Sequence, residues 1–167
     1  MSVSVIDATS TGSTGTVMVS GNMPAFSAYT SSSTNIGNAT ATKVVYATKD
    51  FDTKDYDTNT NFNLSTSVFT PTVAGYYLVS ASTRIPVSGS SAECYITIYK
   101  NSGAYRRGYN PNGITTTNQS LQVNCIVYCN GSTDTISVYA QQNTGSTKST
   151  DAASVLTWFQ GCLLRAT

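Results

Sequence analysis

Four aspartates crowd one short segment and are the residues with the clearest potential for metal chemistry: Asp50, Asp52, Asp55 and Asp57. Hard cations such as Ca²⁺ bind about six to eight oxygen ligands in a flexible loop. The segment lacks the central glycine and the bidentate glutamate of an EF-hand, and aspartates also form turns by bonding to their own backbone. We therefore interpret it as a solvated loop and assign no metal site, with a Ca²⁺ loop as the alternative.

The chain contains no histidine. This removes the Ser-His-Asp and Cys-His arrangements of nucleophilic enzymes and the commonest general base. The sequence also has no nucleophile elbow, phosphate-binding loop or dinucleotide-binding glycine pattern. We predict that the protein is not an enzyme and uses no cofactor.

Four cysteines raise the question of disulfides: Cys94, Cys125, Cys129 and Cys162. Cys125 and Cys129 are four positions apart in a predicted strand, which places them on one side and about 13 Å apart. A disulfide needs Cα atoms within roughly 7 Å, so these two cannot pair while the strand stays regular. Other pairings depend on a strand order that the sequence leaves open. We favour reduced, buried thiols, and closely spaced pairs of zinc ligands are missing.

One basic cluster interrupts a chain that is otherwise nearly neutral, with nine basic and eight acidic residues. Tyr105, Arg106, Arg107 and Tyr109 lie in a segment rich in Gly, Asn and Pro that we interpret as a loop. A phosphate or glycan contact is one use of such a cluster; an exposed loop or a contact between subunits is the favoured alternative. The charge balance lacks the basic footprint of a nucleic-acid-binding protein.

The first 22 residues differ in composition from the rest. Two small apolar patches flank a Ser/Thr/Gly linker that is flexible by composition. The patch residues are Val3, Val5, Ile6, Val17 and Val19. We predict an arm over residues 1–22 that docks on a partner, followed by one domain over residues 23–167; an ordinary disordered terminus is the alternative.

The N-terminus shows no signal-peptide pattern, and no apolar run approaches the roughly 20 residues that span a bilayer. We therefore expect a protein made in a cytoplasm, without membrane insertion.

From residue 24 onward, short β-prone runs alternate with turn signals, and no long window shows a clean helical period. That rhythm predicts an all-β, antiparallel two-sheet sandwich.

The most informative stretch reads strand, corner, strand. Val68 and Phe69 end one β-prone run, and Pro71 belongs at an edge or a turn because it lacks an amide donor. Gly75 is interpreted as permitting a backbone φ that a side chain would forbid. Residues 76–81 then alternate with the period of a strand. This stretch resembles the F-T-x-P-x-x-G-x-Y signature of the C1q/TNF-like family of trimeric jelly rolls.

Seven further landmarks of that family occur in order, over residues 23 to 165. They are Pro24–Ala28, Val44–Tyr46, Tyr56–Asn63, Ile96–Gly103, Leu121–Gly131, Ile136–Ala140 and Phe159–Leu164. Val44–Tyr46 stands where the family has a short hydrophobic strand. The resemblance implies a C1q/TNF-like jelly roll over most of the chain, while a fold by itself does not fix a function.

The resemblance also implies a homotrimer packed around an axis through an aromatic, mostly apolar sheet face. Eleven tyrosines suit such a face, because tyrosine buries area and keeps a polar tip. The interface candidates, chosen by strand position, are Tyr76, Leu78, Ile98, Tyr128 and Tyr139. Burial inside the monomer is the alternative for each of them.

The function that we predict is structural. Bacteriophages use C1q/TNF-like trimers as head fibres and capsid decorations, and low charge, Ser/Thr/Asn richness and the absence of a collagen-like stalk fit a virion protein made in a host cytoplasm. The N-terminal arm would anchor it to other virion proteins. A tail module that recognises a host glycan or protein through loops 101–113 and 143–150 is the alternative, and a secreted C1q-like ligand is the second alternative.

Overall fold

The computed structural model describes residues 23–50, 60–87, 93–110 and 118–167, and within these ranges it is all β, as predicted. The β-branched and aromatic residues of these segments fit a pleated surface better than a helix. The strands are β1 (Ala25–Tyr29), β2 (Asn35–Ile36), β3 (Thr42–Lys43), β4 (Thr48–Lys49), β5 (Phe62–Asn63), β6 (Val68–Phe69), β7 (Ala74–Ile85), β8 (Cys94–Lys100), β9 (Gly103–Asn110), β10 (Gln119–Asn130), β11 (Ile136–Gln142), β12 (Lys148–Ser149) and β13 (Trp158–Ala166). No helix in these ranges could cross a membrane.

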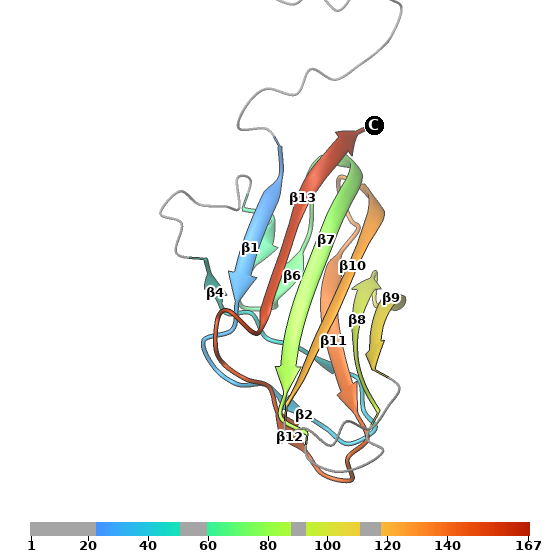
Figure 1. Cartoon of the computed structure of the whole chain (residues 1–167). Helices are drawn as coiled ribbons and strands as arrows, with labels where there is room; N and C mark the ends of the chain where they lie inside the picture. The colour runs from blue at the N-terminus through green and yellow to red at the C-terminus, as the bar shows by residue number, and fades with distance from the viewer. Residues whose placement is uncertain (1–22, 51–59, 88–92, 111–117) are drawn as a thin grey trace, which may run out of the picture.

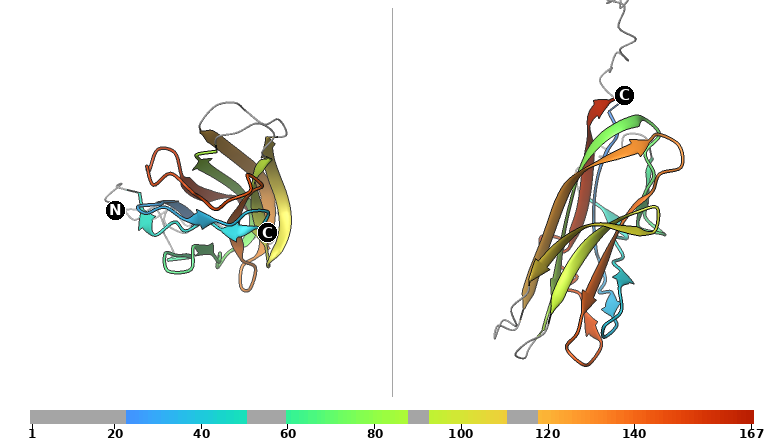
Figure 2. Two further views of the ribbon diagram at one scale, coloured as in Figure 1. Left: turned by 90° about the horizontal axis from the view of Figure 1, so that it is seen from below. Right: turned by 90° about the vertical axis from the view of Figure 1, so that its right-hand side faces the viewer.

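Two antiparallel sheets form the layers of a sandwich (Figures 1 and 2). The first sheet, called here the β7 sheet, has the strand order β10-β7-β13-β1-β4. The second, the β8 sheet, has the order β5-β6-β11-β8-β9, with β3 also pairing with β11. The short strands β12 and β2 pair at one end of the sandwich. The predicted two-sheet sandwich is confirmed.

Alternation along the two longest strands decides which side chains enter the core. On β10, Leu121, Val123 and Val127 are buried, while Gln122, Asn124 and Ile126 face solvent. The strand pairs with β7 along its whole length, from Gln119 opposite Ile85 to Asn130 opposite Ala74. Because side chains have a period of two, this register fixes one outer face for both strands.

Four phenylalanines from both sheets form the centre of the core. The ring centroid of Phe26 lies 4.8 Å from that of Phe62, 4.4 Å from that of Phe69 and 4.7 Å from that of Phe159. All four side chains are buried, and aromatic pairs at such distances add stabilisation beyond the area they bury. The centre of the core therefore joins β1 and β13 of the β7 sheet to β5 and β6 of the β8 sheet.

The strand-corner-strand motif is present as β6, a corner and β7, but Gly75 has a different role from the predicted one. Its φ is not positive; it lies within β7, where a Cβ atom would stand 2.3 Å from the carbonyl oxygen of Arg165. Glycine is needed here because the backbone of β13 lies too close for a side chain at position 75. It is not needed to form a turn.

The segment Val44–Tyr46 forms no strand, contrary to expectation, and its middle residue Val45 is exposed. Val44 and Tyr46 are fully buried, and the amide of Val44 donates to the carbonyl of Val138 at 2.9 Å. The amide of Tyr46 instead bonds to the hydroxyl of Ser67 at 2.8 Å, which ends the ladder after the short strand β3. The strand predicted over Val44–Tyr46 is therefore wrong, although two of the three side chains enter the core.

Candidate functional site

The outer face of the β7 sheet carries the main exposed apolar surface of the described residues. Four side chains on β7 and β10, called here the apolar strip, make it up: Tyr76, Leu78, Ile126 and Tyr128, with 43, 38, 56 and 42% of their surfaces exposed. Leu164 on β13 is also exposed; the register shift of that strand leaves it without a partner residue on β7. Contiguous exposed apolar side chains on a folded domain mark an interaction surface.

The antiparallel register brings these residues into direct contact. Ile126 lies opposite Leu78, and Tyr128 lies opposite Tyr76, with the two tyrosine ring centroids 5.5 Å apart. The ammonium group of Lys100 lies 5.7 Å from the centroid of the Tyr128 ring. The strip is thus a preformed surface of two cross-strand pairs, supported by a cation over one of its rings.

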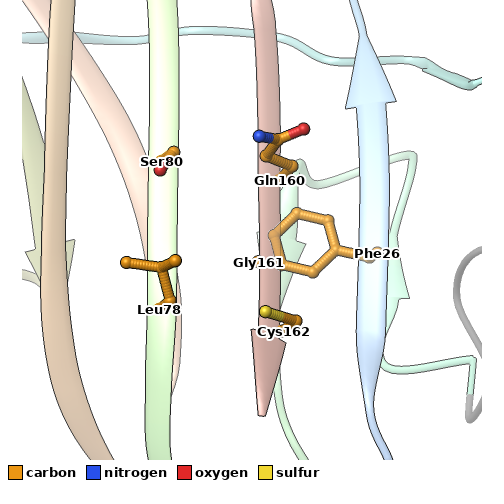
Figure 3. Close-up of a pocket in the computed structure, with 6 residues that line it drawn as sticks. All are labelled: Phe26, Leu78, Ser80, Gln160, Gly161 and Cys162. Carbon is orange, nitrogen blue, oxygen red and sulfur yellow. The ribbon is translucent and has the colours of Figure 1, made fainter. Parts of the chain in front are cut away.

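A shallow hollow of about 150 Å³ adjoins the strip between β7 and β13. Figure 3 shows Leu78 and Ser80 on β7, Gln160 and Cys162 on β13, and the Phe26 ring reaching toward Gly161 from β1. A Cβ atom at Gly161 would lie 2.9 Å from the Phe26 ring, so glycine makes room for this ring. The hollow is mostly apolar and extends the strip across the sheet.

The structure brings together three of the five predicted interface residues and separates the other two. Tyr76, Leu78 and Tyr128 share the apolar strip. The prediction for Ile98 is wrong, because its side chain is fully buried in the core and cannot meet another protomer. Tyr139 belongs to β11 in the opposite sheet, so it cannot lie on the same face as the strip.

The outer face of the β8 sheet carries a different set of side chains, tyrosines paired with cations. The rings of Tyr139 and Tyr99 have centroids 4.1 Å apart, and the Lys43 ammonium lies 5.8 Å from the Tyr139 centroid. On the neighbouring pair of strands, the guanidinium of Arg107 lies 4.0 Å from the centroid of Tyr95. This face is amphipathic and mixed in charge, unlike the apolar strip.

The segment of the predicted recognition residues is a strand and not a loop. β9 spans Gly103–Asn110 and pairs with β8, with a register shift between Ile98 and Tyr99. The glycines that suggested a loop allow close backbone approach: a Cβ atom at Gly108 would lie 1.9 Å from the carbonyl oxygen of Gln122 on β10. The close approach joins the edges of the two sheets.

The strand divides the four recognition candidates between two environments. Tyr109 and Arg107 lie near Tyr95, and the Tyr109 hydroxyl donates to the carboxylate of Glu93 at 2.8 Å. The Tyr105 hydroxyl instead donates to the carbonyl of Ile126 on β10 at 3.2 Å, and the Arg106 guanidinium covers the Tyr105 ring at 4.4 Å. The four side chains therefore form no single binding surface.

The four cysteines form no disulfide in the structure. Burial raises the pKa of the Cys94 and Cys129 thiols to about 11, which leaves very little thiolate at neutral pH. Burial also raises the pKa of Cys125, against the opposing effect of the nearby Arg106 guanidinium. Cys125 and Cys129 lie on the inward side of β10, as their spacing predicted. None of these three has the character of a nucleophile.

The acidic segment lies mostly outside the described residues. Asp52, Asp55 and Asp57 fall in the range 51–59, outside the described residues. The five arm residues fall in the range 1–22, which is also outside them: Val3, Val5, Ile6, Val17 and Val19. Asp50 is described, and its carboxylate accepts a hydrogen bond from the Ser27 hydroxyl at 3.1 Å. In the described part of the chain no three His, Cys, Asp or Glu side chains gather as a metal site would require.

Sequence reasoning missed Ile126, the most exposed member of the apolar strip. A signal for it was present in the sequence. Ile126 lies on the opposite phase of the strand from Leu121, Val123 and Val127, so its side chain must face outward if theirs face inward. The same phase argument places Trp158 on the outer face of β13, two positions before Gln160. Ile126 lies inside the Leu121–Gly131 landmark and Trp158 just before the Phe159–Leu164 landmark, and only the alternation could have shown that their side chains face outward.

Comparison with known proteins shows a fold in common with TNF-like jelly rolls. No family model matches the chain, and no curated protein sequence is significantly similar to it. A solved structure of Eiger TNF from S. frugiperda matches with a TM-score of 0.64 and 10% identity over 87% of this chain and 94% of that one. Murine APRIL at pH 5.0 matches with a TM-score of 0.60 and 10% identity over 85% of this chain and 99% of that one. The TNF-like jelly-roll fold is thus established, and the function remains to be argued from the surface.

Proposed function

We propose that the protein is a non-enzymatic, homotrimeric jelly-roll module that acts by assembly and binding, and that it serves as a virion structural protein. The observation that carries the assembly is the apolar strip. Its four side chains are 38 to 56% exposed in the single chain, although they are aromatic or branched aliphatic residues on rigid, fully paired strands. Burial of such a surface is the dominant favourable term in association.

Two further copies of the same chain are the proposed occupants of this face. The strip is continuous with the hollow over Gly161, so apolar surface extends from β10 across β7 to β13. Closed cyclic symmetry satisfies identical faces without leaving one exposed. The C1q/TNF-like resemblance implies three protomers around an axis through an aromatic, mostly apolar sheet face, and the apolar strip on the outer face of the β7 sheet supports this arrangement.

The oligomeric state tests this assembly directly. We expect the purified chain of 17.6 kDa to sediment as a trimer, and a Leu78→Lys variant to sediment as a monomer, because the lysine places a charge in the strip. Val45→Lys is the matched control: Val45 is 39% exposed against 38% for Leu78, and it lies outside the β7 sheet. A monomeric wild-type chain, or equal effects of the two lysines, would contradict the proposed assembly.

The virion role rests on composition and on the family resemblance. Charged residues make up only 10% of the chain, and Ser, Thr and Asn fill its polar positions. The predicted use is a phage capsid decoration or head fibre, with the arm of residues 1–22 binding other virion proteins. Electron microscopy of the parent particle with antibodies to the domain tests this role: regular labelling of the capsid is expected, and labelled tails or unlabelled particles would overturn it independently of the trimer test.

A receptor-binding module is the second candidate, favoured by the tyrosine and arginine side chains of the β8 sheet. Tyr95, Arg107 and Tyr109 form a contiguous group on one face, in which Arg107 and Tyr109 are exposed and Tyr95 is partly buried. Host-cell binding that is lost in an Arg107→Ala variant, with the trimer intact, would favour this function. The third candidate is a secreted ligand, favoured by the shared fold with Eiger TNF and APRIL; secretion of the chain from its native cell would support it.

A further inference from the structure

A second, more polar pocket lies on the β7 sheet near the start of β13, away from the apolar strip. Its volume is about 260 Å³, just below the roughly 300 to 1,000 Å³ of pockets that hold drug-sized molecules. It is therefore large enough for a ligand of a single ring. The lining residues are Ser27, Tyr29, Asp50, Ser154, Val155, Trp158 and Gln160.

The register of three strands places the aromatic and polar groups of this pocket together. Tyr29 on β1 lies opposite Trp158 on β13, and Ser27 lies opposite Gln160. Asp50 follows β4 directly, and it is tied to β1 twice: its amide donates to the Ser27 carbonyl at 3.1 Å, and its carboxylate accepts from the Ser27 hydroxyl at the same distance. The floor is thus part of the sheet and is rigid.

The remaining wall is the segment before β13, which hydrogen bonds hold against the sheet. The Ser82 hydroxyl donates to the carbonyl of Leu156 at 2.9 Å, and the Thr30 amide donates to the carbonyl of Thr157 at 3.1 Å. Arg84 and Asp151 add an ion pair at 3.6 Å. Val155 nevertheless remains 79% exposed at the rim. The segment before β13 is thus held in place, with Val155 exposed at the rim, as is typical of a preformed binding site.

The chemistry of the lining matches a neutral sugar. Trp158 and Tyr29 supply apolar ring surface for the C–H face of a pyranose, while carboxylate, amide and hydroxyl groups supply both donors and acceptors for its hydroxyls. Asp50 is the only charged side chain of the lining, so an anionic sugar would meet repulsion. A cationic ligand would use the carboxylate, the rings and the Gln160 amide oxygen, but an ammonium group has no acceptor for the Gln160 NH₂ and Trp158 N–H donors.

We propose that this pocket binds one neutral pyranose unit of a glycan, with Trp158 as the stacking platform and with Asp50 and Gln160 as hydrogen-bonding partners. The inference goes beyond the proposed function and does not require the trimer. The pocket shares only Gln160 with the hollow that extends the apolar strip, and Asp50 and Trp158 lie outside both the hollow and the strip. A carboxylate that accepts from sugar hydroxyls makes charge-assisted bonds, which are the strong class.

Trp158 is the only tryptophan of the chain, so its fluorescence reports on this pocket alone. The full chain is titrated with a panel of methyl glycosides of neutral hexoses and N-acetylhexosamines. We expect a saturable fluorescence change with at least one of them, and a loss of affinity of about tenfold or more in Asp50→Asn and Gln160→Ala. Gln141→Ala, an amide on the opposite sheet, is the matched control and should bind as the wild type does.

Equal melting temperatures for the variants and the wild type show that any lost affinity comes from lost contacts. The proposal is overturned if no glycoside gives a saturable fluorescence change, or if Asp50→Asn and Gln160→Ala bind glycosides as the wild type does. It is likewise overturned if methylammonium gives the saturable change and the glycosides do not. It is also overturned if iodide fails to quench Trp158 in the full chain, because the pocket would then be closed to solvent.

Discussion

Tyr76 on β7 and Tyr128 on β10 lie directly opposite each other, with ring centroids 5.5 Å apart and more than 40% of each side chain exposed. Two tyrosines in such a cross-strand pair make one amphipathic patch, whose rings are already oriented before any partner arrives. Because little side-chain entropy remains to be lost, the patch can contribute strongly to association.

We expect Tyr76→Ser and Tyr128→Ser each to weaken self-association by about tenfold or more, measured by sedimentation equilibrium. The double variant should lose less than the sum of the two effects, because either substitution already breaks the pair. Tyr139→Ser is the control: it removes a ring from the tilted pair with Tyr99 on the opposite sheet and should leave association unchanged. An equal effect of Tyr139→Ser would move the interface to the β8 sheet.

Gly108 on β9 should be far less tolerant of alanine than Gly103 on the same strand. A Cβ atom at Gly108 would lie 1.9 Å from the backbone oxygen of Gln122, whereas at Gly103 the nearest atom is 3.4 Å away. We expect Gly108→Ala to lower the free energy of unfolding by about 1–3 kcal/mol or more, because the two sheet edges must move apart. Gly103→Ala should stay within about 0.5 kcal/mol of the wild type.

Urea denaturation of the two glycine variants measures the difference. Similar midpoints for Gly108→Ala and Gly103→Ala would mean that β9 and β10 do not approach as closely as the structure shows.

Most of the fold could be predicted from the sequence, because turn signals and alternation act locally. The stretch around Val68–Ser80 predicted β6, the corner and β7, and the burial phase of β10 follows from its alternation. What failed depended on distant contacts. Gly75 looks like a turn glycine until Arg165 is placed beside it. Ile98 shares one phase of β8 with Ile96, the tyrosines take the other phase, and only the position of the partner sheet decides which phase faces the core.

The candidate site was predicted less well, for the same physical reason. Strand β9 carries an extra residue opposite Ile98 and Tyr99, and this irregularity breaks the alternation that identifies strands. Arg106 and Arg107 are neighbours in sequence, yet one covers Tyr105 and the other covers Tyr95. The basic cluster is continuous in sequence, but its side chains lie in two separate groups in the structure, and no sequence motif indicates this division.

The cysteines should differ in reactivity with a thiol reagent at pH 8. Cys94 and Cys129 are fully buried, and burial raises the pKa of each thiol to about 11, so both lack access and thiolate. Cys162 lines the hollow on the outer face and is only partly buried. Pulsed alkylation with peptide mass spectrometry of the Leu78→Lys variant, in which no second protomer should cover the hollow, should label Cys162 well before the other two.

All four cysteines should react at one rate once the chain is unfolded in urea, which is the internal control. Rapid labelling of Cys94 or Cys129 in the folded chain would show that the sandwich opens far more readily than its packing indicates.

Asp134 gives a prediction for acid stability. Its carboxylate accepts hydrogen bonds from the side-chain amide of Asn101 at 2.6 Å and from the backbone amide of Asn130 at 2.9 Å, and it pairs with Lys100 at 3.0 Å. The Asn101 hydrogen bond, followed by the Lys100 and Asn130 bonds, holds the pKa of Asp134 below its ordinary value of 3.8. The group thus binds together the turn after β10 and the turn between β8 and β9.

Because the folded pKa is depressed, the stabilisation is fully present above the ordinary value of 3.8 and is lost as the pH falls through the lower folded pKa. Asp134→Asn should therefore be less stable than the wild type at pH 7, with the difference shrinking below pH 3.8. Melting temperatures of both chains between pH 7 and about pH 2 measure it. A difference that stays constant across this range would show that the amide fails for steric reasons and that the charge of Asp134 contributes nothing.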